Sequence, residues 1–245
     1  PQFSGTTGET WAFVFNGMIF QGGLVAVPVT SGTFDFPAPF TQQVLAQHAR
    51  QKETALLFDA VPKTDEQSRQ LPDLIEFFSG RKSLEDLVRC ASPQECWVPS
   101  AHGLNALMHH PQEAASLLSK LHRLPVTCDK LYATLPTKAW ELASRFAPFS
   151  DWFWLVQPTP ASVTCTFQAI RRASGVCSEA QHRIIVVGGK GSDEADHVYA
   201  SLLDTSMPFL TRPLQYCGFI PKTQAEEALV RVAKAMCTSE PVAMA

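Results

Sequence analysis

The segment from Thr30 to Pro39 is where this chain would bind a phosphate group. It follows an apolar run at Leu24–Val29 and precedes a helix-like stretch at Thr41–Arg50. A strand–loop–helix junction of this kind binds phosphate when glycine N–H groups converge on it and a lysine offsets the charge. Beyond Gly32 the segment has neither glycine nor lysine, and the carboxylate of Asp35 would repel a phosphate. The sequence therefore predicts a junction that has lost its phosphate-binding groups.

Histidine and cysteine side chains offer two other kinds of chemistry. Metal-ligating types gather at Cys96, His102, His109 and His110. No spacing among them matches a known ligand pattern, so we interpret the histidines as surface or loop residues. Candidate nucleophiles are Cys128, Cys165 and Cys177, which we interpret as core or half-buried because spacing identifies no base for them. We predict no metal and no cofactor.

Composition limits the functional classes. The chain has 245 residues, of which 45% are hydrophobic, and this is enough for one large α/β core. A formal charge of -3 without a basic block argues against nucleic-acid binding. Seven scattered cysteines without a CxxC pair indicate neither a zinc site nor a disulfide framework, which favours a reducing cytoplasm. No apolar run approaches the roughly 20 residues that span a bilayer, so we expect no stable membrane insertion.

Strands and helices alternate along most of the chain, which is typical of a mostly parallel sheet with helices on both faces. Strands are predicted at Leu24–Val29, Thr54–Phe58, Glu95–Val98, Lys130–Ala133, Trp152–Val156, Arg183–Val187 and Leu214–Phe219. Helices are predicted at Thr41–Arg50, Leu71–Phe78, Ser83–Arg89, Pro111–Leu121, Ser162–Ser174, Asp193–Leu203 and Gln224–Met236. The firmest strands are the two apolar runs that begin at Trp152 and Arg183. The expected fold class is thus a three-layer α/β domain.

A small hairpin is predicted to precede the main sheet. Asn16-Gly17, a pair suited to a two-residue turn, lies between the apolar segments Trp11–Phe15 and Met18–Phe20. We interpret this hairpin as an edge extension that covers the core, with a partner-docking element as the alternative. The expected organisation is an extension at residues 1–22 followed by one α/β domain at residues 23–245.

Several segments, in this order and spacing, resemble the MinD/ParA-type P-loop ATPases. They are Val27–Gly32, Thr54–Pro62, Leu74–Gly80, Ser83–Leu87, Ser150–Val156, Pro158–Ser162 and Gly218–Pro221. The resemblance extends over about residues 24 to 236. It implies a P-loop NTPase-like fold, and the nearest types within the family are the flagellar-number regulator FlhG and the cellulose-secretion protein BcsQ.

The resemblance also marks where this chain departs from the family. In the nucleotide loop, the family's signature lysine, four following loop positions and magnesium-binding threonine are replaced by Thr33, Phe34, Asp35, Pro37, Ala38 and Pro39. Ala38 stands at the phosphate-binding lysine. On the metal side, Asp59 remains at a position that the family uses around magnesium, whereas Thr134 falls where a Walker B aspartate is expected. Gly188 stands at the base-contacting asparagine.

These departures predict a pseudo-ATPase. Loss of the lysines, loop glycines and metal ligands together removes phosphate binding and transition-state stabilisation. We therefore expect a non-enzymatic regulatory or scaffold protein that binds other proteins. By resemblance the partner is an active ATPase paralogue, a component of a flagellar, pilus or polysaccharide-secretion machine, or a transcription regulator, and a homodimer is plausible. The alternative is an ATPase switch that binds nucleotide through an unusual P-loop, supported only by Asp59 and the glycines near Gly188.

Overall fold

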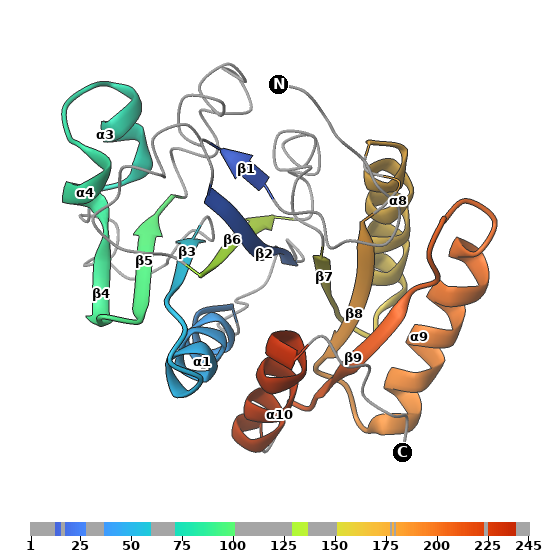
Figure 1. Cartoon of the computed structure of the whole chain (residues 1–245). Coiled ribbons are helices and arrows are strands. Elements are labelled where there is room, and N and C mark those ends of the chain that lie inside the picture. The colour runs from blue at the N-terminus through green and yellow to red at the C-terminus, as the bar shows by residue number, and fades with distance from the viewer. Residues whose placement is uncertain are drawn as a thin grey trace.

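A computed structural model describes residues 13–15, 18–27, 37–59, 72–100, 129–136, 151–176, 178, 180–222 and 225–238. Within these ranges, nine strands form a sheet in the order β4-β5-β3-β6-β2-β7-β8-β9, with β1 paired to β2 (Figure 1). The strands are β1 (Phe13–Phe15), β2 (Met18–Val27), β3 (Ala55–Asp59), β4 (Arg89–Ser92), β5 (Glu95–Pro99), β6 (Lys130–Pro136), β7 (Asp151–Val156), β8 (Gln181–Val187) and β9 (Gln215–Ile220). From β5 to β9 every neighbouring pair is parallel.

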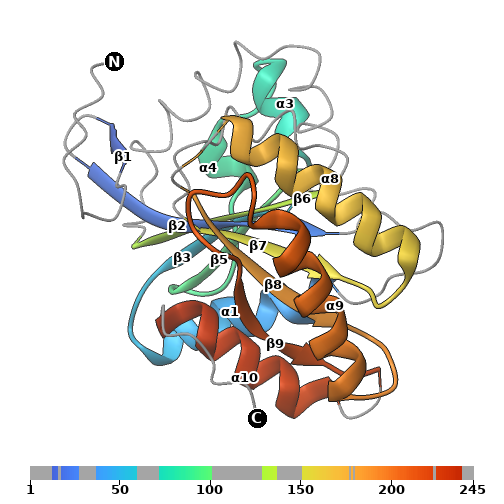
Figure 2. The same cartoon turned by 90° about the vertical axis from the view of Figure 1, so that its right-hand side faces the viewer.

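Helices cover both faces of the sheet, as the sequence predicts. They are α1 (Pro37–Arg50), α3 (Leu74–Phe78), α4 (Leu84–Leu87), α8 (Pro160–Val176), α9 (Ser192–Ser206) and α10 (Ala225–Thr238). One apolar cluster joins the sheet to α3, α4, α8 and α9, and a second joins it to α1 and α10. Figure 2 shows α1 and α10 side by side on one side of the strands. The predicted three-layer α/β class is confirmed.

The central strands are buried on both faces because helices cover both. In β7, Trp152 and Trp154 belong to the cluster under α8 and α9, whereas Phe153 and Leu155 belong to the cluster under α1 and α10. All four side chains are buried. Successive strand residues point to opposite faces, so a wholly apolar run is what such a strand needs.

The predicted serine cap of the second short helix is also present. The Ser83 hydroxyl accepts a hydrogen bond from the Asp86 N–H, and the Asp86 carboxylate accepts one from the Ser83 N–H. This reciprocal pair satisfies two N–H groups that a helix start leaves without partners. The helix α4 extends only from Leu84 to Leu87, and β4 follows at once.

The amino-terminal hairpin is confirmed, and its second strand is longer than predicted. Phe13, Val14 and Phe15 pair antiparallel with Phe20, Ile19 and Met18. The same strand β2 continues to Val27 at the centre of the sheet. Pro28, which the predicted strand would include, lies outside the described residues. The strand β2 crosses residues 22 and 23 without a break. The organisation into an extension at residues 1–22 and a domain at residues 23–245 stays a prediction.

Three features were not expected from the sequence. The sequence analysis did not predict β4, which pairs antiparallel with β5 and sets Cys90 opposite Cys96. A disulfide joins these two cysteines, although the sequence indicated no disulfide framework. That interpretation rested on the absence of close cysteine pairs along the chain, whereas a hairpin brings residues six positions apart into contact. Cys165, expected to be core or half-buried, is exposed on α8.

The short candidate strand at Lys130–Ala133 is instead the seven-residue strand β6, between β2 and β3. Its neighbours on both sides supply the hydrogen bonds that its weak local pattern did not reveal. The helix predicted at Pro111–Leu121 lies outside the described residues. Among the helices that are described, none is long and apolar enough to cross a membrane.

Candidate functional site at the carboxyl ends of the central strands

Chain connectivity places the candidate site where β2 and β6 lie side by side. After β2 the chain passes over β6 to reach β3, and after β6 it passes to β7 on the other side of β2. In parallel α/β sheets, ligands bind outside the carboxyl ends of the strands at such a reversal. The described groups nearest this place are the start of α1, the end of β3 at Asp59 and the later residues of β6.

The start of α1 is poor in hydrogen-bond donors. The helix begins Pro37-Ala38-Pro39-Phe40. The first four N–H groups of a helix point outward without intrahelical partners and are the groups that bind a phosphate. Proline has no N–H, so only Ala38 and Phe40 can donate. The preceding residues Thr33, Phe34 and Asp35 lie outside the described residues, so the predicted loss of the loop stays a prediction there.

Asp59 and Thr134 lie opposite each other at the end of the β3–β6 pair. The Thr134 hydroxyl donates to the Asp59 carboxylate, with Oγ1 and Oδ1 3.1 Å apart, and Oγ1 also lies 3.4 Å from the Phe58 carbonyl oxygen. Both side chains are buried. The sequence analysis assigned both residues to the same metal-side region, and the structure brings them into contact. The pair contains one carboxylate and a neutral hydroxyl.

Local hydrogen bonds cap the start of α8, the helix that follows β7. The Ser162 hydroxyl accepts from the Gln157 N–H at 3.0 Å, and the Thr159 hydroxyl accepts from the Ser162 N–H at 3.3 Å. These serine and threonine side chains occupy N–H groups that a ligand would otherwise use. The start of α8 is therefore capped by the chain itself.

The glycine turn between β8 and α9 is closed in a similar way. The Gly188 N–H donates to the Ile220 carbonyl, and the Glu194 carboxylate accepts from the Lys190 N–H at 2.7 Å. Gly189 has a φ of 97°, and a Cβ there would lie 2.7 Å from a Glu194 carboxylate oxygen. The positive φ of Gly189 therefore favours glycine in this turn.

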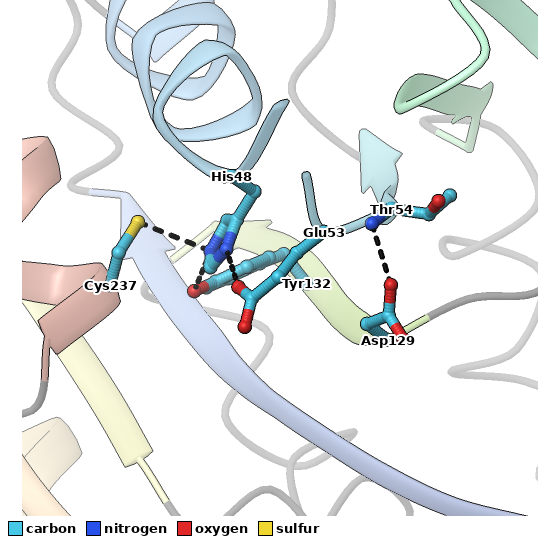
Figure 3. Close-up of polar contacts among 6 residues, drawn as sticks. All are labelled: His48, Glu53, Thr54, Asp129, Tyr132 and Cys237. Atoms are coloured by element: carbon cyan, nitrogen blue, oxygen red, sulfur yellow. Dashed lines mark hydrogen bonds and ion pairs between the residues drawn. The ribbon is translucent and has the colours of Figure 1, made fainter. Parts of the chain in front are cut away.

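A second group of titratable side chains lies on the same face of the sheet, toward the amino ends of the strands (Figure 3). Buried His48 of α1 is 2.7 Å from a Glu53 carboxylate oxygen through Nδ1. Its Nε2 lies 2.8 Å from the Tyr132 hydroxyl and 3.2 Å from Cys237 Sγ of α10. We call these four residues the His48 cluster. Sequence spacing did not identify it, because its members come from positions up to 189 residues apart.

Burial sets the protonation states of this cluster. Burial lowers the pKa of His48, and the hydrogen bond that its Nδ1–H donates to Glu53 opposes that shift. Burial also raises the pKa of the Cys237 thiol to about 12 and that of Tyr132 well above its usual value. At neutral pH the thiol and the phenol therefore keep their protons, and the imidazole is uncharged.

The remaining metal-ligand and nucleophile candidates from the sequence cannot be assigned to either region. His102, His109, His110, Cys128 and Cys177 lie outside the described residues. Within the described ranges, no group of three or more His, Cys, Asp or Glu side chains is placed to hold a metal ion.

Comparison with known proteins relates this architecture to solved structures and not to sequences. No family model matches the chain, and no curated protein is significantly similar to it in sequence. The MinC:MinD cell division protein complex of Aquifex aeolicus superposes with a TM-score of 0.65 at 12% identity, covering 92% of this chain and 98% of that one. A plasmid partition protein from Borrelia burgdorferi gives a TM-score of 0.64 at 11% identity, covering 90% of this chain and 100% of that one.

An enzyme has the same fold. Cobyrinic acid a,c-diamide synthase from Mycobacterium smegmatis, solved with a bound ATP analog and magnesium, gives a TM-score of 0.61 at 15% identity. The match covers 88% of this chain and 93% of the synthase. At these identities the similarity concerns the fold alone. The chain therefore has the three-layer fold of the MinD/ParA-type P-loop ATPases.

Proposed function

We propose that this protein is a non-catalytic, MinD/ParA-like pseudo-ATPase that acts as a regulatory or scaffold protein by binding other proteins. The observation that carries the proposal is the first turn of α1, which reads Pro37-Ala38-Pro39. This turn offers neither a lysine nor a full set of N–H groups to a phosphate. Catalysis of phosphoryl transfer depends on such groups to hold the phosphates and to stabilise developing charge.

The contact between Asp59 and Thr134 supports the same proposal. A magnesium–nucleotide site usually combines carboxylates with phosphate oxygens around the metal. Here the hydroxyl of Thr134 donates to the one carboxylate, at 3.1 Å. A neutral hydroxyl contributes no negative charge to attract a divalent cation. A single carboxylate already held by a threonine hydroxyl supports the proposed loss of metal binding, and no catalytic step is derived through a magnesium–nucleotide complex.

Calorimetric titration with ATP and magnesium chloride tests the proposal. We expect no saturable heat up to millimolar nucleotide, and no phosphate release above the buffer blank. The cobyrinic acid a,c-diamide synthase, which has been solved with an ATP analog, is a positive control of the same fold. Saturable binding in the micromolar range would reject the pseudo-ATPase and favour the alternative, an ATPase switch with an unusual P-loop that uses Asp59.

A protein partner follows from the same reasoning, because a fold without catalytic groups acts through its surface. The MinC:MinD complex contains a chain of this fold together with a second protein. The proposed partners are an active ATPase paralogue or a component of a secretion or motility machine, with a homodimer as a further form. Affinity purification followed by mass spectrometry identifies a partner, and light scattering of the purified chain across concentrations detects a homodimer. A monomer at all concentrations would exclude the homodimer.

We also propose a cytoplasmic location. The Cys90–Cys96 disulfide argues against it, because disulfides are rare in reducing compartments. Acid quenching of cells followed by alkylation and mass spectrometry measures the redox state of this pair. Reduced cysteines support the cytoplasm, whereas a disulfide in most molecules would argue for an oxidising compartment.

A further inference from the structure

We propose that Cys237 is a modification site for small disulfides, with His48 as its general base and Glu53 as the residue that positions the base. The three side chains form a continuous line, with Sγ 3.2 Å from Nε2 and Nδ1 2.7 Å from the carboxylate. A thiol, an imidazole and a carboxylate in hydrogen-bond sequence are the arrangement that activates a protein nucleophile. The proposal does not depend on the proposed function at the other edge of the sheet.

The protonation pattern follows from the chemistry of the partners. A carboxylate only accepts hydrogen bonds, so the imidazole carries its proton on Nδ1, toward Glu53. The lone pair of Nε2 then faces the Tyr132 hydroxyl at 2.8 Å and the Cys237 thiol at 3.2 Å. Both groups donate, and the one lone pair is shared between them. His48 is thus a base pointed at the sulfur.

The chain fold at the end of α1 holds Glu53 against the ring. The Glu53 N–H donates to the His48 carbonyl and the Lys52 N–H to the Ala49 carbonyl, both at 3.0 Å, while Lys52 has a φ of 61°. This pattern is a Schellman motif, which reverses the chain directly after a helix. The Thr54 N–H also donates to the Asp129 carboxylate at 2.8 Å, which fixes the next residue to the start of β6.

Access and selectivity also favour Cys237. Its side chain is half-buried, whereas Cys217 is buried and Cys165 is exposed. The thiol of Cys217 has a pKa of about 12 through burial, as Cys237 does. Within the described part of the chain, no hydrogen bond joins Cys217 to a base. The two thiols therefore resemble each other in ionisation and differ in exposure and in the presence of His48.

The modification is a thiol–disulfide exchange. The Cys237 thiol gives its proton to His48 Nε2 while its sulfur attacks one sulfur of the small disulfide. The S–S bond of the small molecule breaks, and its second sulfur leaves with the electron pair as a thiolate. That thiolate takes up the proton, so the products are a mixed disulfide on Cys237 and one small thiol. Cys237 is oxidised and the small disulfide is reduced, with no other reactant.

The experiment measures modification rates on the full-length protein with hydroxyethyl disulfide, a small neutral disulfide, between pH 5 and 9. Mass spectrometry of peptides reports each cysteine separately, so Cys165 and Cys217 serve as internal references. Glu53→Gln is the main variant, since Glu53 is partly exposed and the amide keeps the shape of the carboxylate. Circular dichroism verifies that the variant is folded, and Cys237→Ser verifies the assignment.

We expect Cys237 to react faster than Cys217 and to reach a rate plateau above neutral pH, because its rate follows the neutral fraction of His48. The charged and titratable groups that face His48 are Glu53, Asp129, Lys130, Tyr132 and Cys237. The Glu53→Gln change should slow Cys237 by about tenfold or more, since the amide can donate to Nδ1 and move the imidazole proton to Nε2. Cys165 should be unaffected by this substitution.

Two results would overturn the proposal. One is a Cys237 rate that rises about tenfold per pH unit up to pH 9 in both proteins, as expected for an unassisted thiol. The other is modification of Cys237 no faster than that of Cys217. The circular dichroism spectrum of Glu53→Gln distinguishes either result from a loss of structure.

Discussion

The two ends of helix α1 differ in the chemistry that they can support. At its start, where the fold's reversal point lies, two prolines lack N–H donors, and at the same edge of the sheet the Asp59 carboxylate accepts from the Thr134 hydroxyl. At its end, His48 contacts a carboxylate, a phenol and a thiol. Tyr132 and Thr134 are alternate residues on one face of β6, and Tyr132 contacts His48 whereas Thr134 contacts Asp59. Among the described residues, this face of the sheet therefore has more titratable groups in mutual contact at its amino edge than at its carboxyl edge.

This difference shows that a fold's usual binding edge does not determine where reactive groups are found. Position at a reversal point is a property of chain connectivity, whereas reactivity requires specific side chains within hydrogen-bond distance. Substitution experiments that add charge at the first edge, or alter hydrogen bonds at the second, test how separate the two edges are.

The largest effect is expected from adding a carboxylate at the carboxyl ends of β3 and β6. Thr134→Asp places a second negative charge next to buried Asp59. We expect a loss of about 3–5 kcal/mol in the free energy of unfolding at pH 7, measured by urea denaturation. The loss should shrink at acidic pH as one carboxyl becomes protonated.

Thr134→Val is the matched control, because it removes only the hydroxyl donor and should cost about 1 kcal/mol. Magnesium at millimolar concentration separates the two interpretations of this edge. If magnesium restores the stability of Thr134→Asp, the edge retains a metal site and our interpretation of it is incorrect.

The next largest effect is the pH dependence of stability that a second buried histidine, His182, contributes. His182, on the opposite face, accepts a hydrogen bond from the Trp154 indole through Nδ1, and burial lowers its pKa from 6.5 to about 4. As pH falls from 6.5 to about 4, the unfolded chain binds a proton that the folded chain does not. Stability therefore decreases on acidification, by about 3 kcal/mol over that window. The measurement is chemical denaturation at a series of pH values.

His182→Asn is the control, since its amide oxygen can accept from Trp154 but does not titrate. The slope that remains in this variant contains the contribution of His48, which has the same sign because burial lowers its pKa too. Glu53 opposes that shift. If the acid slope is unchanged in His182→Asn, the buried neutral histidine is not its source.

The sheet was predictable where its strands are apolar and covered on both faces. The runs at Trp152–Val156 and Arg183–Val187 correspond closely to β7 and β8. By contrast, β4 reads Arg-Cys-Ala-Ser and is partly exposed, so no periodic signal marks it. Its existence depends on the hydrogen bonds of β5, which are not visible in local sequence. The Cys90–Cys96 disulfide was missed for the same reason.

The site was predictable only where the chain resembles a known pattern. Asp59 and Thr134 were singled out because they stand at positions that the resembled family uses around magnesium, and the structure pairs them. Nothing local marks His48, whose importance arises from contacts with Tyr132, 84 residues away, and Cys237, 189 residues away. The left-handed conformation of Lys52 was likewise not predicted, since such a conformation at a lysine has no sequence signature.

A smaller effect is expected from removing one of the two donors at His48 Nε2. Tyr132→Phe deletes a buried hydroxyl whose acceptor keeps a second donor in Cys237. The loss of stability should therefore be only about 1 kcal/mol. With the lone pair left to the thiol, modification of Cys237 by hydroxyethyl disulfide should become faster, by about fivefold for that energy difference. A slower reaction would mean that Tyr132 assists the base instead of competing for it.

The smallest effect concerns the turn that positions Glu53. Lys52 adopts a φ of 61°, which costs an L-residue about 1–2 kcal/mol, whereas glycine adopts it freely but loses more entropy on folding. Lys52→Gly should therefore stabilise the protein by about 0.5 kcal/mol, the balance of these two terms. Gln51→Gly, one residue earlier and without a positive φ, should destabilise it by a similar amount. Because the Schellman hydrogen bonds are retained, Lys52→Gly should leave the Cys237 modification rate unchanged. A decrease in that rate would show that the lysine charge, and not the turn geometry, keeps Glu53 against His48.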